Sequence, residues 1–450
     1  MTSLGNKILI SGDDVTIVPS AKQYKQTLLS LIDSACERIY ITALYVQDDE
    51  AGREILHALY KAKKAHPDLD VKIFVDYHRG QRGLIGEKES MGNRALYLEL
   101  AKHYEQKIDV YGVAVKNKEL FGVLHLKGMV FDNDVFYTGA SINDIYMHQS
   151  EKYRLDRYYQ IRSESLANSF CHYLQSVFVD NGFAPLLNNR EDNAQHNTLP
   201  SPAVQKRHII ALKAKLKKFK YQIDASVQQA SCGHMITIKP LVGFGRRKNE
   251  LNKAIRKVIQ NSQQSILIFT PYFNLPPVLA KDVIKSLKRG VKITMVVGDK
   301  TANDFFINND DAFSFIGIVP YIYEMLLQRF VKRYQQFIDS GLLTIRLWKH
   351  ESNSFHLKGV IADDRFHLLT GSNLNPRAWG LDLENGLLID DPSGILMPKV
   401  NDEIKDILQY TNVIKHYTEI ESIQDYPEKP KNLLKKIKMT QIDRVLKRFL

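Results

Sequence analysis

Cysteine is scarce in this sequence, and long apolar runs are missing. The three cysteines, Cys36, Cys171 and Cys232, lie far apart and form no CxxC pair. Their number and spacing exclude a disulfide framework and a structural zinc site, and they indicate a reducing compartment. No window approaches the roughly 18 consecutive apolar residues of a membrane span, and the N-terminus lacks the apolar core of a signal peptide. We therefore expect a cytoplasmic protein that meets the cell membrane only peripherally, on its inner face.

Acidic residues are too few to balance the basic ones. The 450 residues contain 62 Lys and Arg against 50 Asp and Glu, a formal net charge of +12. This excess points to an anionic partner, which could be nucleic acid, an acidic membrane surface or a phosphorylated substrate. With 44% hydrophobic and 25% charged residues the composition is that of a globular protein, and the length suits two or three domains.

The order of predicted elements is repeated along the chain. Each half carries a strand, a helix and a second strand at similar spacing, which predicts α/β halves with mostly parallel sheets flanked by helices. The offset between the halves is about 220–231 residues, which fits a domain duplication with a pseudo-twofold relation. The segments are Arg38–Ala43, 52–64 and Val71–Asp76 in the first half, and Ser265–Thr270, 277–288 and Val291–Val297 in the second.

Composition suggests the domain boundaries. We predict a first domain over residues 1–183 and a second over residues 221–425. Between them, residues 184–220 form a linker that is rich in Asn and Pro and then becomes basic. Residues 426–450 form a basic amphipathic C-terminal segment.

Two basic segments, 206–220 and 431–450, have apolar residues broadly on one helical side, flanked by Lys and Arg. Helices of this kind bind anionic phospholipid surfaces. An ordinary surface helix packed on the core has the same pattern, so both interpretations stay open.

An HxK motif occurs twice at matching positions. The first is His125-Leu126-Lys127 and the second is His356-Leu357-Lys358, with His-to-Gly spacings of 14 and 15 residues to the turn that follows. A single HxK is most simply a structural core histidine, but two extended copies at matching offsets make coincidence remote. The other motif residues are Asp132, Gly139 and Asn143 in the first half, and Asp363, Gly371 and Asn375 in the second.

The motif residues suit phosphoryl chemistry. Strand alternation puts Val123, His125, Lys127 and Met129 on one face, so imidazole and ammonium point the same way. Halves packed face to face would gather two His, two Lys and two Asn in one site at their interface. Lys and Asn can bind phosphate oxygens, while one His attacks phosphorus and the other protonates the leaving group. No cluster of metal-ligand character accompanies them, so we expect no metal.

The duplicated HxK-x4-D pattern, followed by Gly and Asn, resembles the phospholipase D superfamily. Further segments resemble the bacterial CDP-diacylglycerol–serine O-phosphatidyltransferases within it: Asp76–Gly83, Thr270–Pro276, Val297–Phe305 and Gly371–Asn385. The resemblance implies two phospholipase D-like domains and a transferase that makes phosphatidylserine and CMP from CDP-diacylglycerol and L-serine. It also implies a covalent phosphatidyl-histidine and no cofactor.

The resemblance also implies residue roles. His125 is the expected nucleophile and His356 the expected general acid, while Glu384 and Asp156 would each orient the histidine of the other half. The remaining expected residues are Lys127, Lys358, Asn143 and Asn375 for the phosphate, and Asp132 and Asp363 with a structural role. Each Asn lies one residue later than in the superfamily pattern. Asn373 therefore stays an alternative to Asn375 as the residue that faces the phosphate, and Ser141 stays a possible substitute in the first half.

Polar residues just after predicted strand ends are candidates for binding serine or cytidine, because α/β sites form there. These are Asp76, Arg79, Asn303 and Asp304, together with Tyr272 and Asn274 from the resembling segment. Three other functions compete with the transferase. They are a nuclease of the same fold, although we expect no specific nucleic acid, a non-catalytic binder of anionic lipid, and a cardiolipin synthase, which normally carries N-terminal membrane spans.

Overall fold

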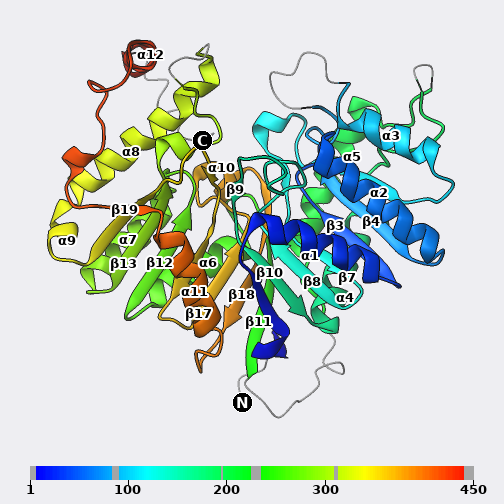
Figure 1. The fold of residues 1–450 in the computed structure, drawn as a ribbon, viewed down its shortest axis with the longest axis horizontal. Coiled ribbons are helices and arrows are strands. Elements are labelled where there is room, and N and C mark those ends of the chain that lie inside the picture. The colour runs from blue at the N-terminus through cyan, green and yellow to red at the C-terminus, as the bar shows by residue number, and fades with distance from the viewer. Residues whose placement is uncertain (1–6, 84–90, 194–195, 224–234, 309–312, 440–450) are drawn as a thin grey trace.

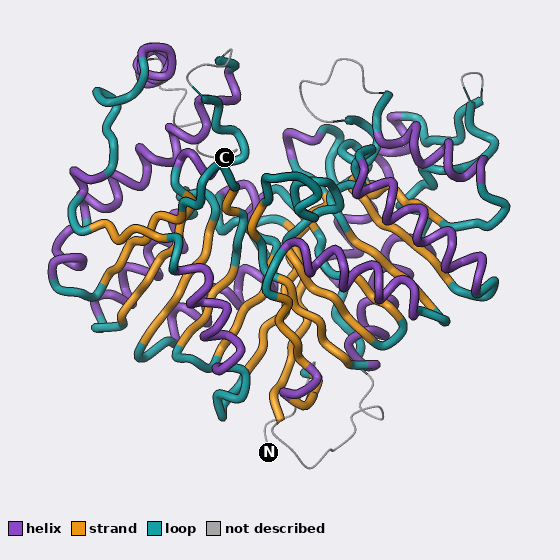
Figure 2. Tube along the Cα trace, in the orientation of Figure 1, coloured by secondary structure: helices purple, strands orange, loops and turns teal. Residues whose placement is uncertain are grey.

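The computed structural model describes residues 7–83, 91–193, 196–223, 235–308 and 313–439. Two α/β halves lie side by side, and the strands β10, β11 and β18 run through the middle of the molecule (Figures 1 and 2). Helices cover both faces of the two sheets. The α/β class and the duplication predicted from the sequence are confirmed.

The first half is built on a seven-stranded sheet in the order β2-β10-β8-β7-β3-β4-β5. Its helices are α1 (Ala21–Ser34), α2 (Glu50–Ala65), α3 (Asn93–His103) and α4 (Glu164–Leu174). Its strands are β2 (Val15–Val18), β3 (Arg38–Thr42), β4 (Asp70–Asp76), β5 (Asp109–Val113), β7 (Met129–Phe131), β8 (Asp134–Thr138) and β10 (Tyr158–Arg162).

The second half is built on a larger sheet in the order β1-β11-β18-β17-β16-β12-β13-β14-β19. The strand at one edge, β1 (Ile8–Ser11), comes from the start of the chain and pairs with β11 (Met235–Phe244). The other strands are β12 (Ser265–Thr270), β13 (Lys292–Gly298), β14 (Leu343–Trp348), β16 (Gly359–Ala362), β17 (Phe366–Thr370), β18 (Leu383–Asp390) and β19 (Thr411–Ile414). The helices are α6 (Glu250–Asn261), α7 (Pro277–Lys288), α8 (Val319–Arg333), α9 (Gln335–Asp339), α10 (Pro376–Gly380) and α11 (Met397–Leu408).

The sequence predicts mostly parallel sheets, but both sheets are mixed. Parallel pairing joins β3, β4 and β5 in one half and β12, β13 and β14 in the other. On the other side of β3 and β12 the pairing is antiparallel, between β3 and β7 and between β7 and β8 in the first half, and between β12 and β16 and between β16 and β17 in the second. The reason is the length of the connections: β7 and β8 are joined by two residues, and so short a turn can only reverse the chain.

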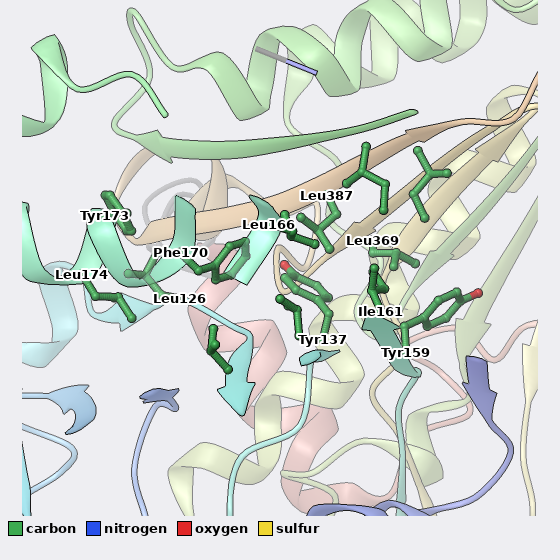
Figure 3. Packing of buried hydrophobic residues seen from close by; sticks show 14 of the residues in the cluster. Leu126, Tyr137, Tyr159, Ile161, Leu166, Phe170, Tyr173, Leu174, Leu369 and Leu387 are labelled. Carbon is green, nitrogen blue, oxygen red and sulfur yellow. The ribbon is translucent and has the colours of Figure 1, made fainter. Parts of the chain in front are cut away.

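One apolar layer joins the two halves. Alternate residues of a strand point to opposite faces, so Ile39 and Ile41 of β3 pack against α1 and α2, while Tyr40 faces inward. In the second half Ile268 of β12 faces α6 and α7, and Phe269 faces inward. The inward faces share one core, which Figure 3 shows with residues of both halves in contact: Leu126, Tyr137, Tyr159, Ile161, Leu166, Phe170, Tyr173, Leu174, Leu369 and Leu387. This core fixes one half relative to the other.

Two very short strands cross between the halves. In the first half β6 (Leu124–His125) pairs with β18 of the second, and in the second half β15 (Ser354–Phe355) pairs with β9 (Arg154–Leu155) of the first. The expectation of one continuous strand face from Val123 to Met129 is wrong. Gly128 has φ +109° between β6 and β7, a conformation that favours glycine, and it redirects the chain there.

Both predicted basic segments form helices, the first as far as Lys218 and the second over its described residues. In α5 (Pro202–Lys218) the apolar residues Ile209, Leu212 and Leu216 are buried in the protein. In α12 (Glu428–Met439), Leu434 and Ile437 are buried in a cluster with residues of α8. These apolar residues of both helices therefore pack inside the protein, whereas Ile210 of α5 is 60% exposed. Residues 440–450 of the predicted segment lie outside the described residues. Among the described helices, none is long and apolar enough to cross a bilayer.

Candidate active site

Each motif histidine is held by a carboxylate from the opposite half. His125, in β6, lies beside Glu384 of β18, and its Nδ1 is 2.9 and 3.0 Å from the two carboxylate oxygens. His356 directly follows β15, and its Nδ1 is 2.9 Å from Oδ2 of Asp156, which directly follows β9. All four side chains are buried. The crossing strands thus position both pairs in the same way.

The half-sites differ in what else touches the histidine. Tyr146 places its hydroxyl 2.9 Å from Nδ1 of His356, and the Lys358 ammonium contacts the same ring. Lys358 also lies 3.2 Å from Asp156. His125, by contrast, makes hydrogen bonds only to Glu384 within the described part of the chain, which leaves its Nε2 free.

The glycine of each motif lies where the two half-sites meet. A Cβ on Gly371 would come within 2.7 Å of Cγ of Lys127, and a Cβ on Gly139 within 2.5 Å of Oδ1 of Asp156. Asn385 locks the same region, because its amide accepts a hydrogen bond from the Lys127 N–H at 2.8 Å and donates one to the Lys127 carbonyl at 2.7 Å. The motif glycines are therefore required for close approach.

Burial and neighbouring cations keep the histidines neutral. Burial, assisted by Lys358, lowers the pKa of His356 to about 3, and burial with Lys127 lowers the pKa of His125 well below its usual value. Burial also lowers the pKa of Lys127 to about 7, and the charge of Lys358 adds to this shift. Lys358 contributes to both of these shifts, and Gly371 of the second motif lies against the side chain of Lys127 of the first, so the two motifs meet in one cationic site.

The two carboxylates have opposite shifts. Burial raises the pKa of Glu384 to about 8. Burial opposes the ionisation of Asp156 too, but Lys358 and His356 outweigh it and hold the pKa of Asp156 at about 2. Asp156 is therefore ionised at neutral pH, whereas Glu384 is largely protonated there because its burial disfavours the charged form.

Both motif asparagines stabilise a turn. The side-chain oxygen of Asn143 accepts from the Tyr146 N–H at 3.0 Å, and that of Asn375 caps α10 by accepting from the Ala378 N–H at 2.9 Å. The Asn143 amide nitrogen donates to the hydroxyl of Tyr45 at 3.3 Å. Oδ1 of Asn373 is buried and has no hydrogen-bond partner among the residues described. The choice between Asn373 and Asn375 as phosphate ligand therefore stays a prediction.

The motif aspartates lie at the other end of the sheets. Asp132 accepts hydrogen bonds from three successive backbone N–H groups, at positions 36–38, where β3 begins. Asp363 does the same for positions 263–265, where β12 begins. These carboxylates tie the β7–β8 and β16–β17 turns to the parallel strands and take no part in the site.

Asp76 does not present a carboxylate to a substrate, contrary to expectation. It is fully buried, and its oxygens accept from the N–H groups of His78, Arg79 and Leu124 at 2.8–2.9 Å. Because Leu124 belongs to β6, Asp76 fixes the strand that carries His125. Arg79 itself stacks 4.6 Å from the ring of Tyr45 and borders the first half-site.

Two of the other predicted substrate residues form one network beside His356. Tyr272 donates to Asp304 at 2.8 Å, and its ring lies edge-on 6.3 Å from that of His356. Asp304 pairs with Arg154 at 2.9 Å, and Arg154 lies 4.8 Å above the ring of Tyr146.

The remaining two candidates are Asn303 and Asn274. Asn303 accepts from the Phe305 N–H at 2.9 Å and closes a turn, and Asn274 is buried. Sequence analysis missed Tyr146, Arg154 and Asn385. Only Asn385 had a local signal, since it directly follows Glu384. The described residues contain no cluster of three or more His, Cys, Asp or Glu side chains that could hold a metal ion.

Comparison with known proteins agrees with this duplicated site. Residues 28–172 and 255–410 each match the family model "Cardiolipin synthase, PLD-like domain". The chain is 42% identical over 448 residues to the CDP-diacylglycerol–serine O-phosphatidyltransferase PssA of Escherichia coli K12, which covers 99% of this chain and 96% of that protein. It is 41% identical to the same transferase of Haemophilus influenzae, over 98% and 96% of the two chains.

The solved structure of the Haemophilus influenzae phosphatidylserine synthase has the same fold, with a TM-score of 0.92 at 40% identity, covering 99% of this chain and 97% of that one. Two related halves with one His-Lys motif each define a protein of the phospholipase D superfamily. Within that superfamily the chain belongs to the family of CDP-diacylglycerol–serine O-phosphatidyltransferases.

Proposed function

We propose that this enzyme transfers the phosphatidyl group of CDP-diacylglycerol to L-serine through a phosphatidyl-histidine intermediate, at a membrane surface. The observation that carries the proposal is the pair of neutral, buried histidines, each bound to a carboxylate of the opposite half in a site with two buried lysines. The family to which the chain belongs supports CDP-diacylglycerol as the donor and L-serine as the acceptor.

In the first step Nε2 of His125 attacks the phosphorus that carries the diacylglycerol. A P–N bond forms, the P–O bond to CMP breaks, and CMP leaves with the electron pair. Support for His125 as the nucleophile comes from its free Nε2 and from the low pKa that keeps the ring neutral. Glu384 hydrogen-bonds Nδ1, and the positive charge that the ring gains in the adduct favours the ionised form of Glu384, which then stabilises that charge.

In the second step the serine hydroxyl attacks the same phosphorus. Its proton passes to His356, the new P–O bond forms, and the P–N bond to His125 breaks. Asp156 suits this role, because it stays ionised and stabilises the imidazolium that forms. Lys127 and Lys358 neutralise the phosphate in both steps.

Exposed apolar side chains near the site support the membrane part of the proposal. Leu120 is 59% and Phe121 45% exposed in the loop after β5, and Phe315 is 65% exposed in the region after β13. Arg377 donates to the carbonyls of Glu119 and Leu120, which ties the first loop to the chain just before Glu384. Both loops follow carboxyl ends of parallel strands, where the substrate of an α/β enzyme binds.

The test is CMP release from detergent-solubilised CDP-diacylglycerol with and without L-serine. We expect serine-dependent CMP and phosphatidylserine in equal amounts. Acid quenching after a short reaction, followed by peptide mass spectrometry, should find the phosphatidyl adduct on His125. Oligonucleotide cleavage without serine-dependent CMP release would overturn the proposal, and an adduct on His356 would reverse the two roles.

A further inference from the structure

A second cleft lies outside the histidine site. It has a volume of about 540 Å³ and lies between the C-terminal end of α5, the strand β11 and the start of α6. A volume of this size accommodates a small-molecule ligand. The cleft therefore needs an explanation separate from the catalytic one.

Unbalanced positive charge lines this cleft. The lysines are Lys217, Lys218, Lys220, Lys239, Lys248 and Lys253. The single acid in the lining, Glu250, is bound to Lys253 at 2.7 Å. Lys217, Lys239 and Lys248 form no ion pair with any described residue. Just beside them, burial and the charges of Lys116 and Lys217 lower the pKa of Lys213, as an uncompensated cationic patch requires.

The floor of the cleft is apolar. Phe219, Tyr221, Val242, Phe244 and Leu383 line it together with the lysines. The rings of Phe219 and Tyr221 are in edge contact, with centroids 5.2 Å apart, so this surface is packed and preformed. A ligand that uses the whole cleft must combine negative charge with apolar surface.

The strand β18 separates the cleft from the catalytic pair. Leu383 lines the cleft, whereas the next residue, Glu384, binds His125. Successive side chains of a strand point to opposite faces. A molecule in this cleft is therefore not the reacting substrate, although it is bound to the strand that holds the catalytic carboxylate.

We propose that the cleft binds one anionic phospholipid as an accessory ligand, with its phosphate among the lysines and part of an acyl chain on the apolar floor. The charge complementarity favours phosphate, and the floor favours a lipid over free phosphate or nucleic acid. The inference rests on one part of the proposed function, namely that the enzyme works at a membrane surface, where anionic phospholipids occur. It also gives a basic protein a means of binding anionic membranes although three large apolar residues of α5, and Leu434 and Ile437 of α12, are buried.

The test compares two triple variants of the full chain. Lys217→Glu/Lys239→Glu/Lys248→Glu reverses charge in the cleft, and Lys281→Glu/Lys285→Glu/Lys288→Glu makes the same change on exposed positions of α7. Binding is measured to phosphatidylcholine vesicles with and without phosphatidylglycerol. Each cation near an anionic surface contributes about a factor of five, so we expect the cleft variant to bind phosphatidylglycerol vesicles about a hundredfold more weakly. The α7 variant should stay within about threefold of the parent protein.

Two measurements make the result specific. Soluble dihexanoyl phosphatidylglycerol should bind the parent protein and not the cleft variant, and inorganic phosphate should bind far more weakly. Equal binding of inorganic phosphate, or an equal loss in the α7 variant, would overturn the proposal. Serine-dependent CMP release from detergent-solubilised donor should be unchanged in the cleft variant, so failure of the lipid site and failure of the proposed function are told apart. The corresponding Lys→Gln triple repeats the test if glutamate disturbs the fold.

Discussion

The two half-sites share one construction and differ in their surroundings. In each, a short strand from one half pairs with a strand of the other and brings a histidine to a carboxylate. Among the described residues, the ring of His125 is hydrogen-bonded only to Glu384, whereas that of His356 contacts Asp156, Tyr146 and Lys358. Duplication supplied two equivalent histidines, and the differences in their neighbours distinguish a ring with a free Nε2 from one that also contacts a tyrosine hydroxyl and a lysine, which supports the two different roles that we propose for them.

The largest expected effect comes from removing each histidine. His125→Ala should abolish turnover, by about 10⁴-fold or more, because no P–N bond can form. His356→Ala should be as slow in steady state but should still release one equivalent of CMP, since CMP is a good leaving group while serine needs a base. Rapid-quench measurement of CMP separates the two variants.

The same experiment can break the assignment. A CMP burst in His125→Ala and none in His356→Ala would exchange the roles of the half-sites. Bursts in neither variant would mean that both histidines are needed to form the adduct. Circular dichroism of both variants provides the control for folding.

The carboxylate partners should separate the half-sites next. Asp156→Asn should lower kcat by about 10³-fold and Glu384→Gln by about 10²-fold, because Asp156 orients both His356 and Lys358. Steady-state CMP release with saturating serine measures both. Equal losses would show that the extra contacts of Asp156 do not matter for turnover.

Stability should respond to the two carboxylates in opposite directions. The pKa of Asp156 is lowered to about 2 on folding, so its ionisation stabilises the protein above about pH 4, and this contribution is lost as the pH falls toward 2. The pKa of Glu384 is raised to about 8, so its protonated form favours folding below about pH 4.5, and this contribution is lost as the pH rises through 8. At pH 8–9, thermal unfolding should show Asp156→Asn destabilised and Glu384→Gln stabilised, each by about 1–3 kcal/mol.

The sequence predicted local structure better than contacts across the interface. Strand 265–270 and helix 277–288 were predicted at their observed bounds, because each is a strong apolar pattern with clear ends. The HxK duplication also pointed to the two histidines that the structure pairs with buried carboxylates of the opposite half. The pairing of β6 with β18, and the kink at Gly128, depend on how the halves pack, which no local pattern records.

Asp156 shows the limit for a single residue. It lies 31 residues after His125, whereas Glu384 lies 28 residues after His356, so the duplicated spacing pointed to it less clearly. Its position after β9 became evident only from the strand pairing. Asp76 shows the converse error: a polar residue after a strand suited a ligand site, but its oxygens are used by backbone N–H groups.

Tyr146 allows a finer test of the asymmetry. Tyr146→Phe removes one hydrogen bond to His356 and leaves the ring, so kcat should fall about three- to tenfold. Tyr45→Phe is the matched control, because within the described part of the chain the Tyr45 hydroxyl bonds Asn143 and no histidine. The pH–rate profile should shift only in Tyr146→Phe, since only that hydroxyl acts on a titrating ring. A shift of the same size in Tyr45→Phe would assign the effect to packing.

The smallest expected effect is that of a chelator. Each half-site contains a buried lysine, Lys127 in one and Lys358 in the other. In the proposed mechanism these lysines bind the phosphate oxygens, so the chain itself supplies the charge that a metal ion could supply. Prolonged treatment with EDTA, followed by its removal, should leave serine-dependent CMP release unchanged for the parent protein. Lys127→Met and Lys358→Met make the comparison informative: each should lose activity that no divalent ion restores. Recovery of one variant by magnesium would show that a metal ion can replace that lysine. The two half-sites would then differ in whether a metal ion can take the place of the lysine.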